Sequence, residues 1–240
     1  MPNDYFQFRQ FRVEQGACAM KVSTDACLLG AALDLSGATR LLDIGTGTGL
    51  LALMAAQRHP AVEIEAVEID AAAAAQAAAN AAACPWAARI RVLPRSLAQH
   101  AAANPAPYSH LVCNPPFFGN SWPSANQARR TARHASETSL SFEEIADFAA
   151  RFLLPAGALT VLLPPPEMAR FEAIAAAAGL PAATRLAVRH RPDGRITRYI
   201  CRFERTSRAM TETELLIHAG PGPEYSQAFA KLLAGFYLAL

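Results

Sequence analysis

Three alternating glycines follow an acidic residue in a stretch whose spacing suits a cofactor loop. Asp43 lies two residues before Gly45, and Gly47 and Gly49 follow at every second position. Glycine has no Cβ, so such a backbone can turn sharply and approach a ligand closely. The spacing departs from the G-x-G-x-x-G fingerprint of dinucleotide sites, because Leu50 stands where the last glycine would be. Since Asp43 would repel a pyrophosphate, the loop indicates a ligand with an ammonium group.

A second acid stands where a ribose would be held. Glu68 ends a predicted strand, 19 residues after Gly49. In doubly wound folds a carboxylate at this place can accept hydrogen bonds from both ribose hydroxyls. Each acid alone is equally well explained as a solvated strand end. Together with the glycine loop, the two acids predict a nucleoside cofactor.

The tetrapeptide Asn114-Pro115-Pro116-Phe117 has the residue types that activate a weakly nucleophilic nitrogen. The lone pair of an aromatic amine or an amide is delocalised, and acceptors on its two N–H groups draw the nitrogen toward tetrahedral geometry. The Asn114 side-chain oxygen and the Pro115 carbonyl are such acceptors. The prolines stiffen the turn by fixing φ, and Phe117 offers a face on which a base can stack. Proline turns after strands are common, so the prediction depends on the position of this one beside the glycine loop.

The elements that must position these residues alternate between strand and helix. Buried strands are predicted at 40–44, 63–69, 89–93, 109–113 and 158–163. Helices are predicted at 50–59, 71–83, 142–153 and 168–179. This alternation predicts an α/β fold with a mostly parallel sheet and helices on both faces. Ligands of such folds bind at the carboxyl ends of the strands, where the glycine loop and the tetrapeptide lie.

The N-terminal part precedes this alternation. Residues 5–13 predict a strand or hairpin, and Thr24 is expected to cap a helix that runs to about Leu33. We expect residues 1–35 to form a segment ahead of a domain that spans residues 36–240.

The C-terminal part predicts a strand pair around the Pro192-Asp193-Gly194 turn, with strands at 184–190 and 196–204. A further candidate strand covers 214–219, and the tail from Ser226 to Leu238 is predicted to be a helix. No internal repeat is apparent.

Composition limits the class of protein. With 52% hydrophobic and 18% charged residues in 240, the chain can form a full core and does not read as disordered. No apolar run reaches the roughly 18 residues of a membrane span, and the N-terminus lacks a signal-peptide core, so we expect a cytoplasmic protein. No obligate protein partner is evident. The five cysteines form no C-x-x-C pair, so neither a disulfide framework nor a metal site is expected.

The glycine loop followed by Glu68 resembles the cofactor site of class I S-adenosylmethionine-dependent methyltransferases. The resemblance implies a Rossmann-like fold with a seven-stranded, mostly parallel sheet that ends in an antiparallel strand pair. It also implies that the loop, including Thr46, faces the amino-acid portion of the cofactor, with Asn114 nearby and Glu68 on the ribose. Many members carry an acid after the third strand, facing the cofactor adenine. The nearest candidate here is Ser96, which can accept a hydrogen bond.

The tetrapeptide resembles the NPP(Y/F) signature of amino-methyltransferases, which serves adenine N6, guanine N2 and glutamine N5. The run from Cys18 to Gly30, the stretch LLDIGTGTGLLALMAAQR and the tail EYSQAFAKLLAGFYL resemble the bacterial tRNA(Val) adenine-37 N6-methyltransferases. This resemblance covers nearly the whole chain. It implies methyl transfer from S-adenosylmethionine to adenine N6 in tRNA. Departures are Ser23 for glycine and Phe117 where tyrosine is common.

The same resemblance implies further contacts. Segment 24–30 would close over the cofactor and target pocket, with Thr24 at the cofactor and Lys21 on a carboxylate or a phosphate. The loop at 118–140 lies beside the tetrapeptide, and its basic residues are expected to bind RNA phosphates. The RNA-binding candidates in this loop are Arg129, Arg130 and Arg133.

A second basic set lies on the terminal strand pair. Strand alternation puts only some of its members on one face, and the sequence assigns none of them individually. The set consists of Arg185, Arg189, His190, Arg191, Arg195 and Arg198.

Three alternatives stay open at this point. A protein glutamine N5-methyltransferase of the release-factor type usually carries a separate N-terminal helical domain, whereas about 35 residues precede the sheet here. An rRNA guanine-N2 methyltransferase is often built from two related domains. A non-catalytic RNA-binding module of the same fold would not need Asn114, Phe117 and Glu68.

Overall fold

A central β-sheet organises the chain in the computed structural model, which describes residues 4–18, 20–116, 140–206 and 208–239. The strands in the first half of the sheet are β3 (Arg40–Ile44), β4 (Glu63–Glu68), β5 (Ile90–Pro94), β6 (Tyr108–Cys113) and β7 (Leu153–Leu163). The remaining strands of this sheet are β8 (Ala182–Arg189), β9 (Ile196–Glu204) and β10 (Thr211–Leu216). These correspond to the predicted strands, with β7 beginning earlier than expected.

The order of strands across the sheet is β10-β8-β9-β7-β6-β3-β4-β5. β3 to β7 are mutually parallel, and β9 is antiparallel to both β7 and β8. The α/β fold class and the antiparallel terminal pair are therefore confirmed. Among the described residues the sheet has eight strands, one more than the expected seven. The eighth strand is β10, which overlaps the further candidate strand at 214–219 and pairs in parallel with the outer side of β8.

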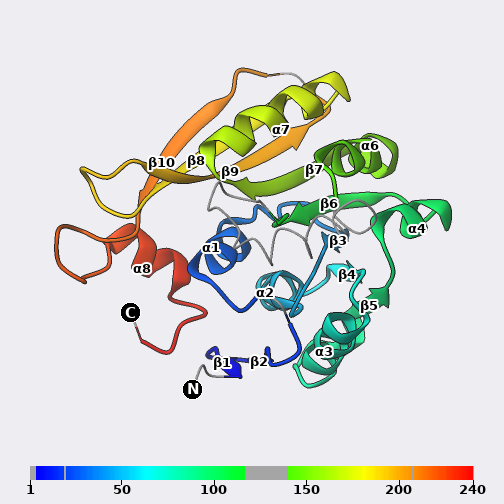
Figure 1. The fold of residues 1–240 in the computed structure, drawn as a ribbon, viewed down its shortest axis with the longest axis horizontal. Coiled ribbons are helices and arrows are strands. Elements are labelled where there is room, and N and C mark those ends of the chain that lie inside the picture. Colours follow the sequence, from blue (N-terminus) through cyan, green and yellow to red (C-terminus); the bar gives the residue numbers. More distant parts are fainter. Residues whose placement is uncertain (1–3, 19, 117–139, 207, 240) are drawn as a thin grey trace, which may run out of the picture.

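Helices cover both faces of the sheet (Figure 1). One face carries α1 (Thr24–Ala32), α2 (Leu50–Arg58), α3 (Ala71–Ala82) and α8 (Gln227–Leu233). The other carries α4 (Leu97–Ala102), α6 (Phe142–Phe152) and α7 (Pro165–Ala177). Each face has its own cluster of buried apolar side chains, as expected when a twisted sheet is packed on both sides.

Local sequence signals explain where several helices begin. Ser141 and Glu144 form a reciprocal capping box at the start of α6. Pro165 occupies the first turn of α7, where the missing N–H costs nothing, so this helix starts earlier than predicted. At α1 the cap is Ser23, whose hydroxyl accepts a hydrogen bond from the Ala26 amide, and Thr24 is the first helical residue instead. The expected cap at Thr24 is corrected by one residue.

The N-terminal residues form the predicted hairpin, with β1 (Tyr5–Gln7) antiparallel to β2 (Arg12–Glu14). Figure 1 shows this hairpin below the sheet, close to the C-terminal tail. The ring of Phe6 lies 5.9 Å from that of Tyr237, and the Arg9 amide donates to the Phe236 carbonyl at 2.8 Å. Both ends of the chain are thus packed against each other.

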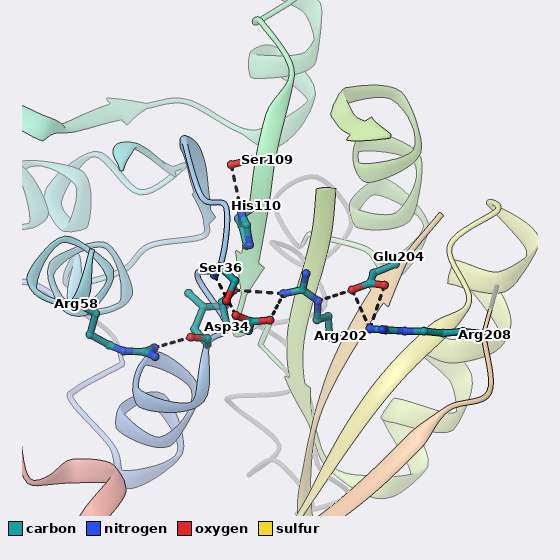
Figure 2. A network of polar contacts seen from close by, with 9 residues as sticks. Asp34, Ser36, Arg58, Ser109, His110, Arg202, Glu204 and Arg208 are labelled. Atoms are coloured by element: carbon teal, nitrogen blue, oxygen red, sulfur yellow. Dashed lines mark hydrogen bonds and ion pairs between the residues drawn. The ribbon is translucent and has the colours of Figure 1, made fainter. Parts of the chain in front are cut away.

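A partly exposed polar network links the end of α1 to β9 of the sheet (Figure 2). Arg58 donates to the Leu33 carbonyl, and Arg202 on β9 pairs with Asp34 at 3.1 Å. Arg202 also pairs with Glu204 at 2.6 Å. Burial and the nearby Arg202 charge lower the pKa of His110 to about 4, so this histidine is neutral at pH 7. Arg202 is thus paired with acids on both sides, whereas Arg58 is held by the Gly30 and Leu33 carbonyls.

Within the part of the chain that the structure describes, no helix is long and apolar enough to cross a membrane. The same residues contain no group of three or more histidine, cysteine or acidic side chains arranged to hold a metal ion.

Candidate active site

Two adjoining cavities lie at the carboxyl ends of the parallel strands. One measures about 580 Å³ and the other about 520 Å³. They share the wall residues Ile44, Gly45, Glu68, Ile69 and Leu140, so they form one groove over β3 and β4. The sequence analysis places the ligand at this edge of the sheet, and both cavities lie there.

The glycine loop forms the floor between the two cavities. Gly45 and Gly47 have φ angles of 68° and 55°, a conformation that favours glycine. A Cβ added at either residue would meet nothing within 4 Å, so open space lies in front of both. Gly49 begins α2 with a φ of 85° and packs against Ala77 of α3. The first two glycines therefore face the open groove, whereas the third packs against α3.

Glu68 holds the edge of this loop. Its Oε2 accepts a hydrogen bond from the Gly47 amide at 2.9 Å, and its Oε1 accepts one from the Asp70 amide at 3.0 Å. The residue lines both cavities. Each carboxylate oxygen has two lone pairs, so the same side chain can still accept hydrogen bonds from a bound ligand.

Asp43 lies behind the loop and lines neither cavity. Its side chain is fully buried, and its Oδ2 accepts hydrogen bonds from the Thr46 hydroxyl at 2.5 Å and the Ala52 amide at 3.3 Å. Burial raises the pKa of Asp43 to about 7, and the negative charge of Glu68 adds to the rise. The structure thus places Asp43 and Thr46 where they hold the loop in shape.

The Asn114-Pro115-Pro116 turn closes one end of the larger cavity. Asn114 follows β6 directly, and its Oδ1 is buried without a hydrogen-bond partner among the described residues. A buried acceptor without a partner costs about 1–3 kcal/mol, and such a group in a native structure calls for an explanation. A donor on a bound ligand would supply the missing hydrogen bond. Phe117 lies outside the described residues.

The smaller cavity extends beyond the end of β5, along the start of α4. Its wall there includes Pro94, Arg95, Ser96, Leu97 and Gln99. The Ser96 hydroxyl accepts from the Gln99 amide at 3.1 Å as the cap of α4. Ser96 therefore borders the groove, as the sequence places it, and its hydroxyl is also engaged in starting a helix that the sequence analysis missed.

The N-terminal part contributes a strap that covers the larger cavity, consisting of residues 15–18 and 20. Gly16, Ala17, Cys18 and Met20 line that cavity. Segment 24–30, expected to close over the pocket, is instead a buried helix packed on α2, with Gly30 against Met54. The strap therefore covers the cavity, a role that the resemblance had assigned to segment 24–30.

Lys21 and Thr24, which the resemblance placed at the ligand, line neither cavity in the structure. Lys21 lies 3.8 Å from Asp4 on the N-terminal side of the strap. The predicted RNA-binding residues Arg129, Arg130 and Arg133 lie outside the described residues.

Asn80 on α3 ties the strap to the glycine loop, and the sequence analysis did not single it out. Its Oδ1 accepts from the Glu14 amide at 2.9 Å, and its Nδ2 donates to the carbonyls of Glu14 and Thr48 at 2.8 and 2.9 Å. Gln76 adds a weaker contact, because its Oε1 accepts from the Ala17 amide at 3.3 Å. A signal was present: these are the two polar residues of an alanine helix, spaced four apart on one face.

The comparisons with known proteins agree with this geometry. The Methyltransferase small domain family matches residues 14–162. Relatives named tRNA1(Val) (adenine(37)-N6)-methyltransferase include one from Dyadobacter fermentans, 41% identical over 98% of both chains. Another, from Pseudoalteromonas translucida, is 40% identical over 97% of this chain and 98% of its own. A third, from Bacteroides thetaiotaomicron, is 39% identical over 100% of each.

Solved structures support the fold. A predicted O-methyltransferase from Agrobacterium tumefaciens superposes with a TM-score of 0.63 at 22% identity, covering 88% of this chain and 96% of its own. A putative RNA methyltransferase from Pyrococcus horikoshii gives 0.56 at 21% identity, covering 79% and 88%. At these identities the likeness concerns the arrangement of strands and helices.

We call the three hydrogen bonds that Asn80 makes to Glu14 and Thr48 the Asn80 clamp. Removing this clamp should destabilise the protein, and the strap most of all. Asn80→Ala would leave two carbonyls and one amide without partners, which should lower the free energy of unfolding by about 2–4 kcal/mol. It should also speed proteolytic cleavage of residues 1–23. Gln76→Ala removes one longer bond at an exposed place, so it should cost well under half as much. Urea denaturation and timed proteolysis check this, and equal behaviour of the two variants would contradict the clamp.

The raised pKa of Asp43 predicts a pH-dependent cost of folding. Between its unfolded value near 4 and its folded value of about 7, the folded state holds a proton that the unfolded chain has lost. Stability from this group is therefore lost as the pH rises through that window. Asp43→Asn keeps the shape without the ionisation, so its advantage over the wild type should grow to on the order of 4 kcal/mol by pH 8. Denaturation midpoints at pH 4 to 8 measure this, and a constant difference would refute it.

Proposed function

Because this chain belongs to the family of tRNA1(Val) (adenine(37)-N6)-methyltransferases, within the Methyltransferase small domain proteins, we propose that it methylates adenine N6 in tRNA. The methyl donor is S-adenosylmethionine. The observation that carries the proposal is the buried, unpartnered Asn114 Oδ1 at one end of the groove. We further propose adenine 37 of a valine tRNA as the target, after the names of the relatives, and the cytoplasm as the location.

The groove fits the cofactor by its own geometry. Gly45 and Gly47 leave open space at the floor, where the amino-acid portion would lie. Glu68 borders both cavities, and its carboxylate would accept hydrogen bonds from the ribose hydroxyls. The adenine would lie along Pro94 and Leu97, which line the smaller cavity. When bound, S-adenosylmethionine supplies an electrophilic methyl group on a positively charged sulfur.

The residues at the other end suit a target amine. The Asn114 oxygen and the Pro115 carbonyl would each accept one hydrogen of the exocyclic amino group. This pair orients the nitrogen lone pair and stabilises the positive charge that develops as the new bond forms. The methylated nitrogen is strongly acidic, so it can lose its extra proton to water in the groove, and the site needs acceptors that orient the amine rather than a strong base. Positioning and electrostatics provide the catalysis.

The walls of the larger cavity restrict competing reactions. Cys18 is the thiol in that wall, and burial together with the charges of Glu68 and Asp70 raises its pKa. The thiol therefore stays protonated at neutral pH and is a poor methyl acceptor. We propose that Phe117 stacks on the target base after the base has left its neighbours in the loop.

The site chemistry alone would also suit guanine N2 or glutamine N5. What favours adenine is the match to the named relatives along 97–100% of this chain, including the strap and the C-terminal tail. The proposed partner is tRNA, and the basic loop residues Arg129, Arg130 and Arg133 are proposed to contact its phosphates.

Substitution of Asn114 tests the proposal. Asn114→Ala removes one of the two acceptors, so kcat for tRNA methylation should fall on the order of 10²–10³-fold. Binding of S-adenosylmethionine, measured by calorimetry, should stay within about twofold, because the amide faces the target.

Asn114→Asp serves as the matched control, since it keeps an acceptor at the same place. It should retain clearly more turnover than Asn114→Ala. If Asn114→Ala retains full turnover, or both variants fail equally because the cofactor no longer binds, the assigned role is wrong.

A further inference from the structure

The basic residues of the β8–β9 hairpin fall into two groups in the structure. One group is neutralised by acids on neighbouring elements, with nitrogen–oxygen distances of 2.6 to 2.8 Å. These pairs are Arg185 with Glu172, Arg189 with Glu214, and Arg198 with Asp25. These ion pairs connect the hairpin to α7, β10 and α1. Because the three arginines are already neutralised, they are poor candidates for binding a ligand.

The second group sits in the turn that joins the two strands. His190, Arg191 and Arg195 are exposed, and none of them makes an ion pair with any residue that the structure describes. Asp193 is the one acid in the same turn. The turn therefore presents net positive charge to solvent, in contrast to the compensated strands below it.

The register of the sheet places this turn beside the active-site groove. β8 runs parallel to β6, so its carboxyl end lies at the same edge of the sheet. Cys113 is level with Arg185 across β7 and β9, and β8 continues four residues further, to Arg189. Strand geometry then puts the turn about 13 Å above the level of Asn114 and about 14 Å to its side.

The turn is held in one shape by hydrogen bonds. Arg189 donates to the Gly194 carbonyl at 2.6 Å, and the Gly194 amide donates to the Arg191 carbonyl at 3.0 Å. The His190 carbonyl accepts from the His218 amide at 3.0 Å, which fastens the turn to the segment after β10. A fixed backbone lowers the entropy cost of presenting the two free guanidinium groups to a partner.

We propose that the 190–195 turn binds backbone phosphates of the tRNA on one side of the target nucleotide, with Arg191 and Arg195 as the contacts. The inference rests on tRNA being the substrate. Guanidinium groups match phosphate oxygens in a bidentate manner. A base extruded into the groove leaves the nucleotides around it outside. Because the turn lies both above Asn114 and to its side, it would contact phosphates of neighbouring nucleotides rather than the target nucleotide itself.

Binding and turnover of Arg191→Ala/Arg195→Ala test the surface. At about 0.15 M salt the Kd for tRNA should rise on the order of tenfold, and the slope of log Kd against log salt should drop by about 1.5, since two contacts no longer release counterions. The kcat at saturating tRNA and the affinity for S-adenosylmethionine should be unchanged. Arg191→Lys/Arg195→Lys keeps both charges and should restore most of the affinity.

The matched control is Arg91→Ala/Arg208→Ala, which removes the same charge from exposed side chains near the opposite edge of the sheet. It should leave both the Kd for tRNA and the salt slope close to wild type. If the turn variant and the control behave alike, the turn does not contact RNA and the inference falls. If the wild type does not methylate tRNA at all, the proposed function is wrong. The binding measurement would still show whether the 190–195 turn contacts RNA.

Discussion

The hydrogen bonds that two carboxylates make to the glycine loop are the constraint on which the active site depends. Asp43 holds the loop from behind, through Thr46 and Ala52, and Glu68 holds it from the front, through Gly47. A loop built on positive φ angles has little intrinsic preference for one shape. These contacts select a shape in which Gly45 and Gly47 face open space. The groove, its two ends and the position of Asn114 all follow from that floor.

The N-terminal strap is in turn held in position relative to the glycine loop. Asn80 bonds to Thr48 in the loop and to Glu14 at the end of β2. The wall that covers the target side is thereby fixed relative to the floor on which the cofactor would lie. Because α3 supplies Asn80 and begins three residues after Glu68, the same strand–helix unit contributes to both the floor and the covering wall of the groove.

Much of this arrangement was predictable, because it depends on local patterns. The buried runs and helix periods predicted the α/β fold, and the glycine spacing with Glu68 predicted which edge of the sheet carries the groove. Tertiary contacts account for what was missed. Asp43 carries the charge that suits an ammonium group, but its burial behind Thr46 becomes visible only when the strand is packed. The strap, rather than segment 24–30, lines the cavity because α1 is buried against α2. No sequence motif indicates this packing. Strand alternation likewise could not divide the hairpin arginines into paired and unpaired, since their acids come from α1, α7 and β10.

In the proposed reaction, the acceptors at the end of β6 direct a methyl group onto the exocyclic amine of adenine. The most direct measurement is nucleoside mass spectrometry of tRNA incubated with the protein and S-adenosylmethionine carrying an isotopically labelled methyl group. The account predicts that the label appears in N6-methyladenosine. Label on a ring nitrogen of adenine, on a ribose oxygen or on guanine N2 would contradict it.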